Sequence, residues 1–199
     1  MKTHRNYRSR HAWMVVSLLI AAGCLYFFAQ HPPREVAINA GTSVSTPVAA
    51  GETPGAIAVY FAPDTPGAAD GIAAALIAFI ASARVSVCCA FYELDYVPAA
   101  RALIERKKAG VTVGIVSDSD YKGEQAIREC IAAGIPVVFD ERSPFMHDKF
   151  CVVDGEKVWT GSTNCTENCL FRNDNNSVCI ASPELAQDYT LEFREMFEQ

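Results

Sequence analysis

The central part of the chain alternates between helical and strand-like patterns of apolar residues. Apolar side chains recur at helical spacing over residues 70–83, and residues 84–92 form a short, almost continuous apolar run. The same reasoning predicts strands at 56–62, 111–116 and 135–139 and helices at 98–108 and 124–133. Helices that alternate with short apolar strands predict an α/β fold, a layered α/β/α sandwich with a mixed, largely parallel sheet.

The pattern changes in the last quarter of the chain, where short strands follow one another without long helices between them. Strands are predicted at 150–153, 157–160 and 177–181, and a final helix at 183–197. The pair Asp154-Gly155 between the first two strands is typical of a tight hairpin. This part of the sheet is therefore predicted to be mixed in direction.

The N-terminal residues differ from the rest in composition. Residues 1–11 form a basic flank, and residues 12–29 are 18 residues without a charge. About 20 apolar residues span a bilayer, so 12–29 predicts a transmembrane anchor. The basic flank would stay in the cytoplasm, which leaves the remaining chain extracytoplasmic, and periplasmic if the source is bacterial.

Three alternatives to an anchor stay open for the same segment. A cleaved signal segment would make the protein secreted, Cys24 faintly resembles a lipoprotein acceptor, and an organelle leader is the third alternative. Residues 30–55 are rich in Pro, Gly, Ser and Thr and predict a flexible linker. Residues 56–199 are predicted to form the one folded, catalytic domain.

Charge narrows the classes of partner. The chain has a formal net charge of −6, and residues 56–199 hold 12 Lys and Arg against 21 Asp and Glu, a net of −9. The overall field of the domain therefore gives no general affinity for polyanions. Half of the residues are hydrophobic, which excludes a wholly disordered protein.

The residues with the clearest chemistry lie between Met146 and Asn164. His147, Lys149 and Asp154 fit the pattern H-x-K-x4-D, and Gly161, Ser162 and Asn164 follow as G-S-x-N. An imidazole can attack phosphorus or protonate a leaving oxygen near neutral pH, and an ammonium offsets the charge of the non-bridging oxygens. Ser162 and Asn164 are expected to add neutral donors to the same oxygens, together with Lys149. Asp154 is expected to be a structural or electrostatic partner rather than the nucleophile.

These residues resemble the phospholipase D superfamily, the HKD enzymes. The resemblance implies catalysis by His147, Lys149 and Asp154 through a phosphohistidine, with no metal ion and no cofactor. It extends over residues 56–199, where Phe61-Ala62-Pro63-Asp64 and Gly134-Ile135-Pro136-Val137 look like the single-motif branch. That branch contains small bacterial endonucleases and the membrane-anchored mitochondrial cardiolipin hydrolase.

The histidine count bears on assembly. The four histidines are His4, His11, His31 and His147, so the domain has one imidazole. A mechanism with one attacking and one protonating histidine cannot be assembled within a single copy. Single-motif members of the family pair as homodimers, and a symmetric homodimer with two facing copies of His147 is predicted.

One position departs from the family pattern. The family has N-x-E-N, whose glutamate holds the catalytic histidine, whereas this chain reads Asn173-Asp174-Asn175-Asn176. Asn175 is therefore the candidate for orienting His147, and its amide oxygen can accept a bond from the imidazole without stabilising a cation. With Asn175 in place of the glutamate, either the activity is reduced or Asp174 holds His147 instead.

Three functions are compatible with these residues. A metal-independent endonuclease is the first expectation, with Lys149, Arg142, Arg172 and Lys122 as a local groove for nucleic acid. The alternatives are a phospholipase D acting on membrane phospholipids such as cardiolipin or phosphatidylcholine, and a phosphate-binding module with weakened catalysis.

Two further groups of residues carry polar or sulfur-containing side chains. Residues 118–121 follow the end of a predicted strand and could line the site, although a solvated loop explains them better. Of the eight cysteines, Cys88, Cys89 and Cys151 are predicted to pack in the core. An oxidising compartment would favour disulfides, for instance between Cys165 and Cys169, and the absence of a paired CxxC argues against a metal site.

Overall fold

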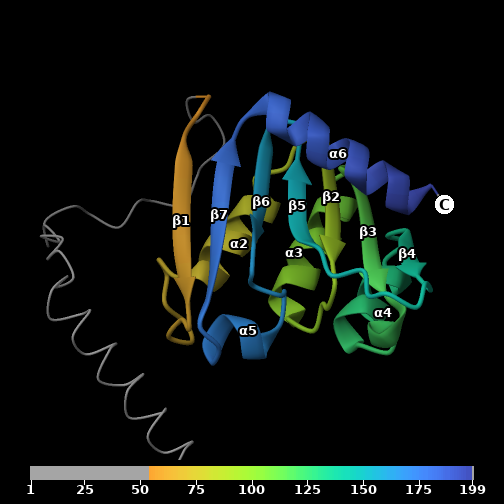
Figure 1. Ribbon diagram of the computed structural model, residues 1–199, viewed down its shortest axis with the longest axis horizontal. Coiled ribbons are helices and arrows are strands. Elements are labelled where there is room, and N and C mark those ends of the chain that lie inside the picture. Colours follow the sequence, from red (N-terminus) through yellow and green to blue (C-terminus); the bar gives the residue numbers. More distant parts are fainter. Residues whose placement is uncertain (1–53, 199) are drawn as a thin grey trace, which may run out of the picture. The chain divides into compact units, whose positions relative to one another are not determined.

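The computed structural model describes residues 54–198, and within them a seven-stranded sheet and six helical segments (Figure 1). The strands are β1 (Ile57–Ala62), β2 (Ser86–Phe91), β3 (Thr112–Asp118), β4 (Val137–Asp140), β5 (Lys149–Val153), β6 (Lys157–Gly161) and β7 (Asn175–Ala181). The helices are α2 (Ile72–Ala81), α3 (Val97–Lys108), η1 (Ser119–Tyr121), α4 (Gln125–Ala132), α5 (Glu167–Phe171) and α6 (Pro183–Phe197). Every predicted helix and strand is present, with ends within two residues of the prediction.

The strand order is β1-β7-β6-β5-β2-β3-β4, and most neighbours run antiparallel. Only β2 with β3 and β3 with β4 are parallel, since α3 and α4 supply the crossovers between them. The other four pairs are antiparallel. The prediction of a largely parallel sheet was therefore wrong, because β5 enters beside β2 without a crossover helix and then reverses through a hairpin.

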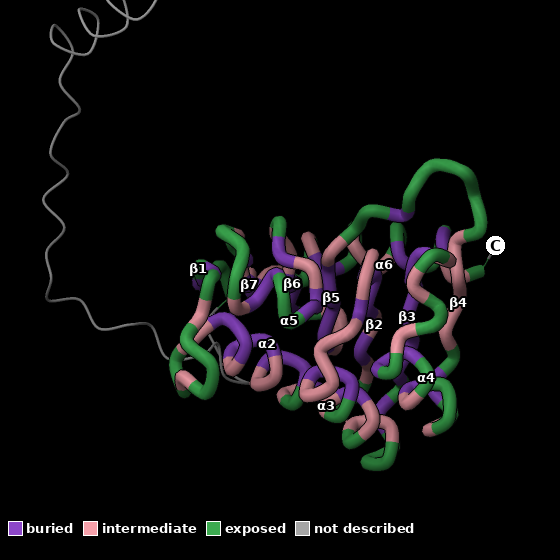
Figure 2. Tube along the Cα trace, turned by 90° about the horizontal axis from the view of Figure 1, so that it is seen from below, coloured by how far each residue is buried: buried purple, intermediate pink, exposed green. Residues whose placement is uncertain are grey.

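Helices cover both faces of the sheet, which confirms the α/β/α layering. Figure 2 shows α2, α3 and α4 on one side and α6 on the other. The larger core joins the first face to its helices around Phe79, Leu103 and Ile127. A smaller core joins α6 to the opposite face around Phe150 and Phe193. Burial on both faces holds β5 and β2 rigidly in the middle of the sheet.

The β5–β6 hairpin turns tightly at Asp154 and Gly155, as predicted. Both residues have positive φ, 57° and 66°. Positive φ at these two residues reverses the chain within the three residues 154–156 that join Val153 to Lys157. β5 pairs with β6 on one side and antiparallel with β2 on the other. This pairing places the beginning of β5 close to the end of β2.

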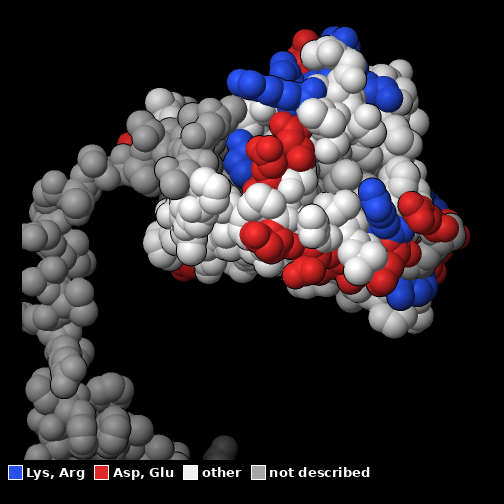
Figure 3. Space-filling view, turned by 90° about the horizontal axis from the view of Figure 1, so that it is seen from above, with Lys and Arg blue, Asp and Glu red and all other residues white. Residues whose placement is uncertain are grey.

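Figure 3 looks onto the end of the sheet opposite to the beginning of β5. Basic and acidic side chains both appear on that surface, so it presents no continuous basic track for a polyanion.

The predicted membrane segment at 12–29, its flank at 1–11 and residues 30–53 of the linker lie outside the described residues. Within residues 54–198, no helix has the length and apolar character required to cross a bilayer.

The seven cysteines of the described chain are free thiols. Cys89 and Cys151 are fully buried and face each other across β2 and β5, which confirms that they pack in the core. Cys88 is half-buried. Cys165 and Cys169 are buried beside the loop that follows β6, and they are not joined to each other.

Candidate active site

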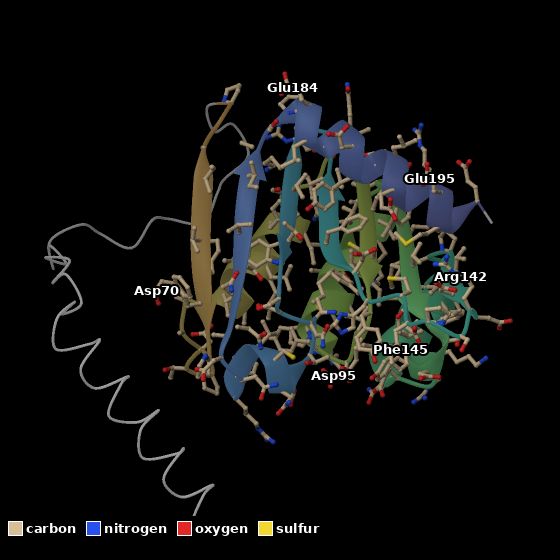
Figure 4. The ribbon with its side chains drawn as sticks, in the orientation of Figure 1. Asp70, Asp95, Arg142, Phe145, Glu184 and Glu195 are labelled. Atoms are coloured by element: carbon tan, nitrogen blue, oxygen red, sulfur yellow. The ribbon has the colours of Figure 1, made fainter. Side chains whose placement is uncertain are left out.

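The candidate site lies at one edge of the sheet, where β2, β3 and β6 end and β5 and β7 begin. The antiparallel register places Lys149 opposite Phe91, the last residue of β2. On the other side of β5, Phe150 pairs with Thr160, one residue before the end of β6. Phe145 and Asp95 lie at this edge in Figure 4. The fold therefore brings the two halves of the sequence motif, 147–149 and 161–164, to one place.

His147 and Lys149 share a contact with one aromatic ring. His147 lies two residues before β5 and is exposed, and its ring centroid is 4.6 Å from that of Tyr92. The Lys149 ammonium lies 4.8 Å from the same Tyr92 centroid and donates a hydrogen bond of 2.6 Å to the His147 carbonyl. An accessible imidazole and an ammonium thus contact the same ring, and both are groups that a phosphate site uses.

Ser162 and Asn164 follow β6 at the same edge. The Ser162 hydroxyl donates to Asn175 Oδ1 at 3.0 Å and accepts from the Asn176 N–H at 3.1 Å. Asn164 is half-buried, and its Oδ1 is buried with no hydrogen-bond partner among the described residues. A buried amide oxygen without a partner is costly, which is typical of a position that serves a ligand.

Asn175 begins β7 beside these residues. Its amide oxygen accepts from Ser162, and its amide nitrogen donates to the Cys169 carbonyl at 3.4 Å. Neither partner is His147, so the structure places Asn175 in the site without the predicted bond to the imidazole. Asp174, the alternative residue for this role, is exposed.

Replacing Asn175 by glutamate should raise the turnover number about fivefold, because a charge-assisted hydrogen bond is about twice as strong as a neutral one. The carboxylate would supply the negative charge that stabilises an imidazolium. Steady-state kinetics measure the effect, with Asn173→Glu as a control that adds the same charge two residues away. An unchanged turnover number for Asn175→Glu would count against an orienting role.

The structure does not bring Asp154 together with His147 and Lys149. Asp154 lies beyond the other end of β5, roughly 20 Å from His147 at about 3.3 Å per residue. Its carboxylate accepts hydrogen bonds of 2.7 to 3.1 Å from the N–H groups of Arg84, Val85 and Ser86. These donors belong to the beginning of β2, so Asp154 fastens the hairpin to that strand.

Gly161 meets a steric requirement at the end of β6. Its φ is 151°, and a Cβ there would lie 2.3 Å from the Asn176 carbonyl oxygen. Gly161→Ala should therefore lower the free energy of unfolding by about 2 kcal/mol, because β7 must shift away. Urea denaturation measures the loss, with Gly123→Ala as the control, since a Cβ at Gly123 meets no atom within 4 Å. Equal stability of the two variants would contradict this account.

Carboxylates surround the candidate site. Burial raises the pKa of Glu93, and the charges of Asp95 and Glu124 add to the rise. Burial also raises the pKa of Asp95, whose carboxylate accepts a hydrogen bond of 2.8 Å from the Glu167 N–H. Burial lowers the pKa of the Lys149 ammonium, an effect that nearby acidic groups oppose.

Two of the four basic residues expected in a nucleic-acid groove are paired with carboxylates. Arg142 forms an ion pair of 2.7 Å with Asp140, at the end of the outermost strand β4, and the bond to Arg142 lowers the pKa of Asp140. Lys122 lies 3.8 Å from Glu141. The surroundings of Lys149 are thus less basic than the sequence suggested.

Of residues 118–121, Asp118 and Tyr121 contact segments of the candidate site, whereas Asp120 is exposed. Asp118 is buried, 3% exposed, and its Oδ2 accepts a hydrogen bond of 2.9 Å from the Met146 N–H. The Tyr121 hydroxyl donates to the Tyr92 hydroxyl at 3.1 Å. In the sequence, only their position directly after a predicted strand pointed to the site. Their contacts with Tyr92 and Met146 join segments far apart in the chain, so no local sequence pattern reveals them.

Within the described residues, no three His, Cys, Asp or Glu side chains are grouped so that they could hold a metal ion.

Comparison with known families decides the classification. The family model described as "Cardiolipin synthase, PLD-like domain" matches residues 76–197, which include β5, β6 and the candidate site. The chain belongs to this PLD-like family. A mitochondrial cardiolipin hydrolase of Danio rerio is 34% identical over 129 residues, which are 62% of this chain and 56% of that protein. The chain spans about half the length of the curated relatives that it matches.

Solved structures of the PLD-like family share the fold. Nuc from Salmonella typhimurium, a phospholipase D family member, superposes with a TM-score of 0.66 at 29% identity, over 72% of this chain and 95% of that one. NucT from Helicobacter pylori gives a TM-score of 0.61 at 21% identity, over 72% and 96% of the two chains. The resemblance to the phospholipase D superfamily is therefore confirmed.

Proposed function

We propose that this PLD-like protein hydrolyses phosphodiesters through a covalent phosphohistidine. His147 attacks phosphorus, the bond to the leaving oxygen breaks, and that oxygen takes a proton. Water then breaks the nitrogen–phosphorus bond and releases the phosphomonoester. The observation that supports this most is the exposed His147 imidazole beside the Lys149 ammonium, both in contact with Tyr92. Lys149, Ser162 and Asn164 would bind the non-bridging oxygens.

A second copy of the chain would complete the site. The leaving oxygen requires a proton donor, and residues 56–199 contain one histidine. In a twofold homodimer the second His147 would face the first and donate that proton. The exposed position of His147 at the edge of the sheet is compatible with such an approach.

The surroundings of the site favour a substrate with few negative charges. Glu93 lies close to Lys149 and to Asp95, and the ion pairs of Arg142 and Lys122 reduce the free positive charge available to a polyanion. Membrane phospholipids such as cardiolipin or phosphatidylcholine fit this better than a nucleic acid does. Endonuclease activity, the first expectation from the sequence, is here the second candidate, and the similarity to Nuc over 72% of the chain favours it.

Parallel assays with the full chain test these candidates. The substrates are single-stranded DNA, RNA, and vesicles of cardiolipin or of phosphatidylcholine, each with a chelator present and with His147→Ala as the blank. Release of phosphatidic acid or phosphatidylglycerol that depends on His147 would support the lipase, and cleavage of DNA or RNA would support the nuclease. Phosphate binding without turnover on any substrate would support a phosphate-binding module and overturn the proposed hydrolysis.

Residues 12–29 are proposed to anchor the protein in a membrane. Their 18 uncharged residues and the basic flank before them support this. The catalytic domain would then be extracytoplasmic. Detection of the full chain in the carbonate-resistant membrane fraction, and its release when residues 1–29 are deleted, would test the anchor and distinguish it from a cleaved segment.

A further inference from the structure

We propose that Tyr92 is a positioning residue that holds the His147 imidazole and the Lys149 ammonium in one arrangement, and that Tyr121 and Asp118 hold Tyr92 in place. The inference rests on the proposed function, since it concerns how the reacting groups of that site are oriented. Tyr92 follows the last residue of β2, and its ring is the surface that both side chains contact.

The Tyr92 ring supplies an electrostatic contact where the chain lacks the family's glutamate. The Asn175 amide is engaged with Ser162 and with the Cys169 carbonyl. The face of a phenol ring carries partial negative charge and attracts a cation. The ring lies 4.8 Å from the Lys149 ammonium and stabilises its charge, and it packs against the imidazole with ring centroids 4.6 Å apart.

The backbone of Tyr92 is fixed on both sides. Its N–H donates to the Asp148 carbonyl at 2.9 Å, in the segment that carries His147. Its carbonyl accepts from the Asp118 N–H at 3.4 Å, in the segment that ends β3. Tyr92 is therefore bound between the neighbours of β2 at the edge where the site lies.

The phenol of Tyr92 is fixed by Tyr121. The Tyr121 hydroxyl donates a hydrogen bond of 3.1 Å to the Tyr92 hydroxyl, and the two rings meet edge to face with centroids 4.9 Å apart. This hydrogen bond raises the pKa of the Tyr121 phenol, and burial adds to the rise. Tyr121 therefore remains a donor at neutral pH and limits rotation of the Tyr92 ring.

Asp118 connects both sides of this arrangement. Its Oδ1 accepts a hydrogen bond of 3.0 Å from the Asp120 N–H. This bond caps the beginning of η1, the turn that carries Tyr121. Its Oδ2 accepts from the Met146 N–H at 2.9 Å, one residue before His147. A buried carboxylate with two backbone donors is a rigid anchor. One side chain thus sets the positions of Tyr121 and of the His147 backbone.

The first test measures turnover of bis(p-nitrophenyl) phosphate by the full chain. Tyr92→Leu should lower kcat about 30-fold with KM changed less than about threefold, because misplaced catalytic groups cost rate more than binding. Tyr92→Phe and Tyr121→Phe should each lower kcat about fivefold, and the double variant also about fivefold, since both remove the same hydrogen bond. Tyr189→Phe, which removes a hydroxyl from α6, is the matched control.

The second test needs no turnover and reports the imidazole directly. In protein labelled at the histidine ring, the His147 resonance, assigned by its absence in His147→Ala, should move in Tyr92→Leu and in Tyr121→Phe but not in Tyr189→Phe. If the wild-type chain hydrolysed no phosphodiester, the proposed function would fail while this spectrum still decided the positioning role. Unchanged kcat in Tyr92→Leu, a 25-fold loss in the double variant, or an unmoved resonance would overturn the proposal.

Discussion

Replacing His147 by alanine should lower the turnover of every phosphodiester substrate by at least about ten-thousandfold, because the proposed nucleophile is removed. His147 is exposed, so the variant should fold with an unchanged thermal midpoint. The measurement is single-turnover kinetics at saturating enzyme. His31→Ala, which removes an imidazole from the predicted linker, is the matched control and should retain full activity.

A trapping experiment extends this result to the intermediate. Quenching the wild-type reaction with alkaline detergent should give phosphate bound to protein through a nitrogen, which survives base and is lost on later treatment with acid, and His147→Ala should give none. Turnover that survives in His147→Ala, or trapped phosphate on another residue, would refute the assignment of the nucleophile.

The same variant tests the shared site. If each site needs His147 from two copies, co-expression with a ninefold excess of His147→Ala should lower the activity per wild-type subunit about tenfold, because most wild-type chains would then pair with an inactive copy. Activity in proportion to wild-type chains alone would show that each copy works independently.

Replacing Asp154 by alanine should lower the free energy of unfolding by about 3 kcal/mol, which is a large share of the stability of a single domain. Three backbone N–H groups at the beginning of β2 would lose their acceptor. Alanine would also have to adopt the positive φ of 57° at this position. Chemical denaturation followed by tryptophan fluorescence measures the change.

Two comparisons separate this structural role from a chemical one. Asp154→Asn keeps an acceptor and tolerates positive φ, so it should lose about half as much stability. Glu156→Ala, an exposed acidic residue two positions later, should be nearly neutral. The folded fraction of Asp154→Asn should retain wild-type kcat, and a collapse of kcat at full stability would contradict the structural role.

The sequence predicted the elements well and their directions less well. The spacing of apolar residues located every long helix and strand, because that spacing reflects which face of each element is buried. It carried no information on the path of residues 141–148, which delivers β5 antiparallel to β2. Helix α5 was missed because its five residues are too few for a helical period to be recognised.

The candidate site was predictable where its residues share a local pattern. His147 and Lys149 are neighbours in sequence and contact the same ring in space, and Ser162 reaches the same edge through the hairpin. Tyr92 and Tyr121 come from the ends of two other strands. Only the folded sheet reveals their contact, since residues 29 positions apart carry no common period.

The length of β5 separates the residues of the H-x-K-x4-D motif, so that they lie at opposite edges of the sheet and serve different roles. His147 and Lys149, the proposed reacting residues, lie at one edge of the sheet, whereas Asp154 accepts hydrogen bonds from backbone N–H groups at the opposite edge. A search that ranks distant homologues by all three motif residues therefore scores two different properties together. The histidine and lysine report on catalysis, whereas the aspartate reports on stability of the fold. A homologue that has lost the aspartate but closes the turn in another way should be counted among the enzymes, whereas one that has lost the histidine should not.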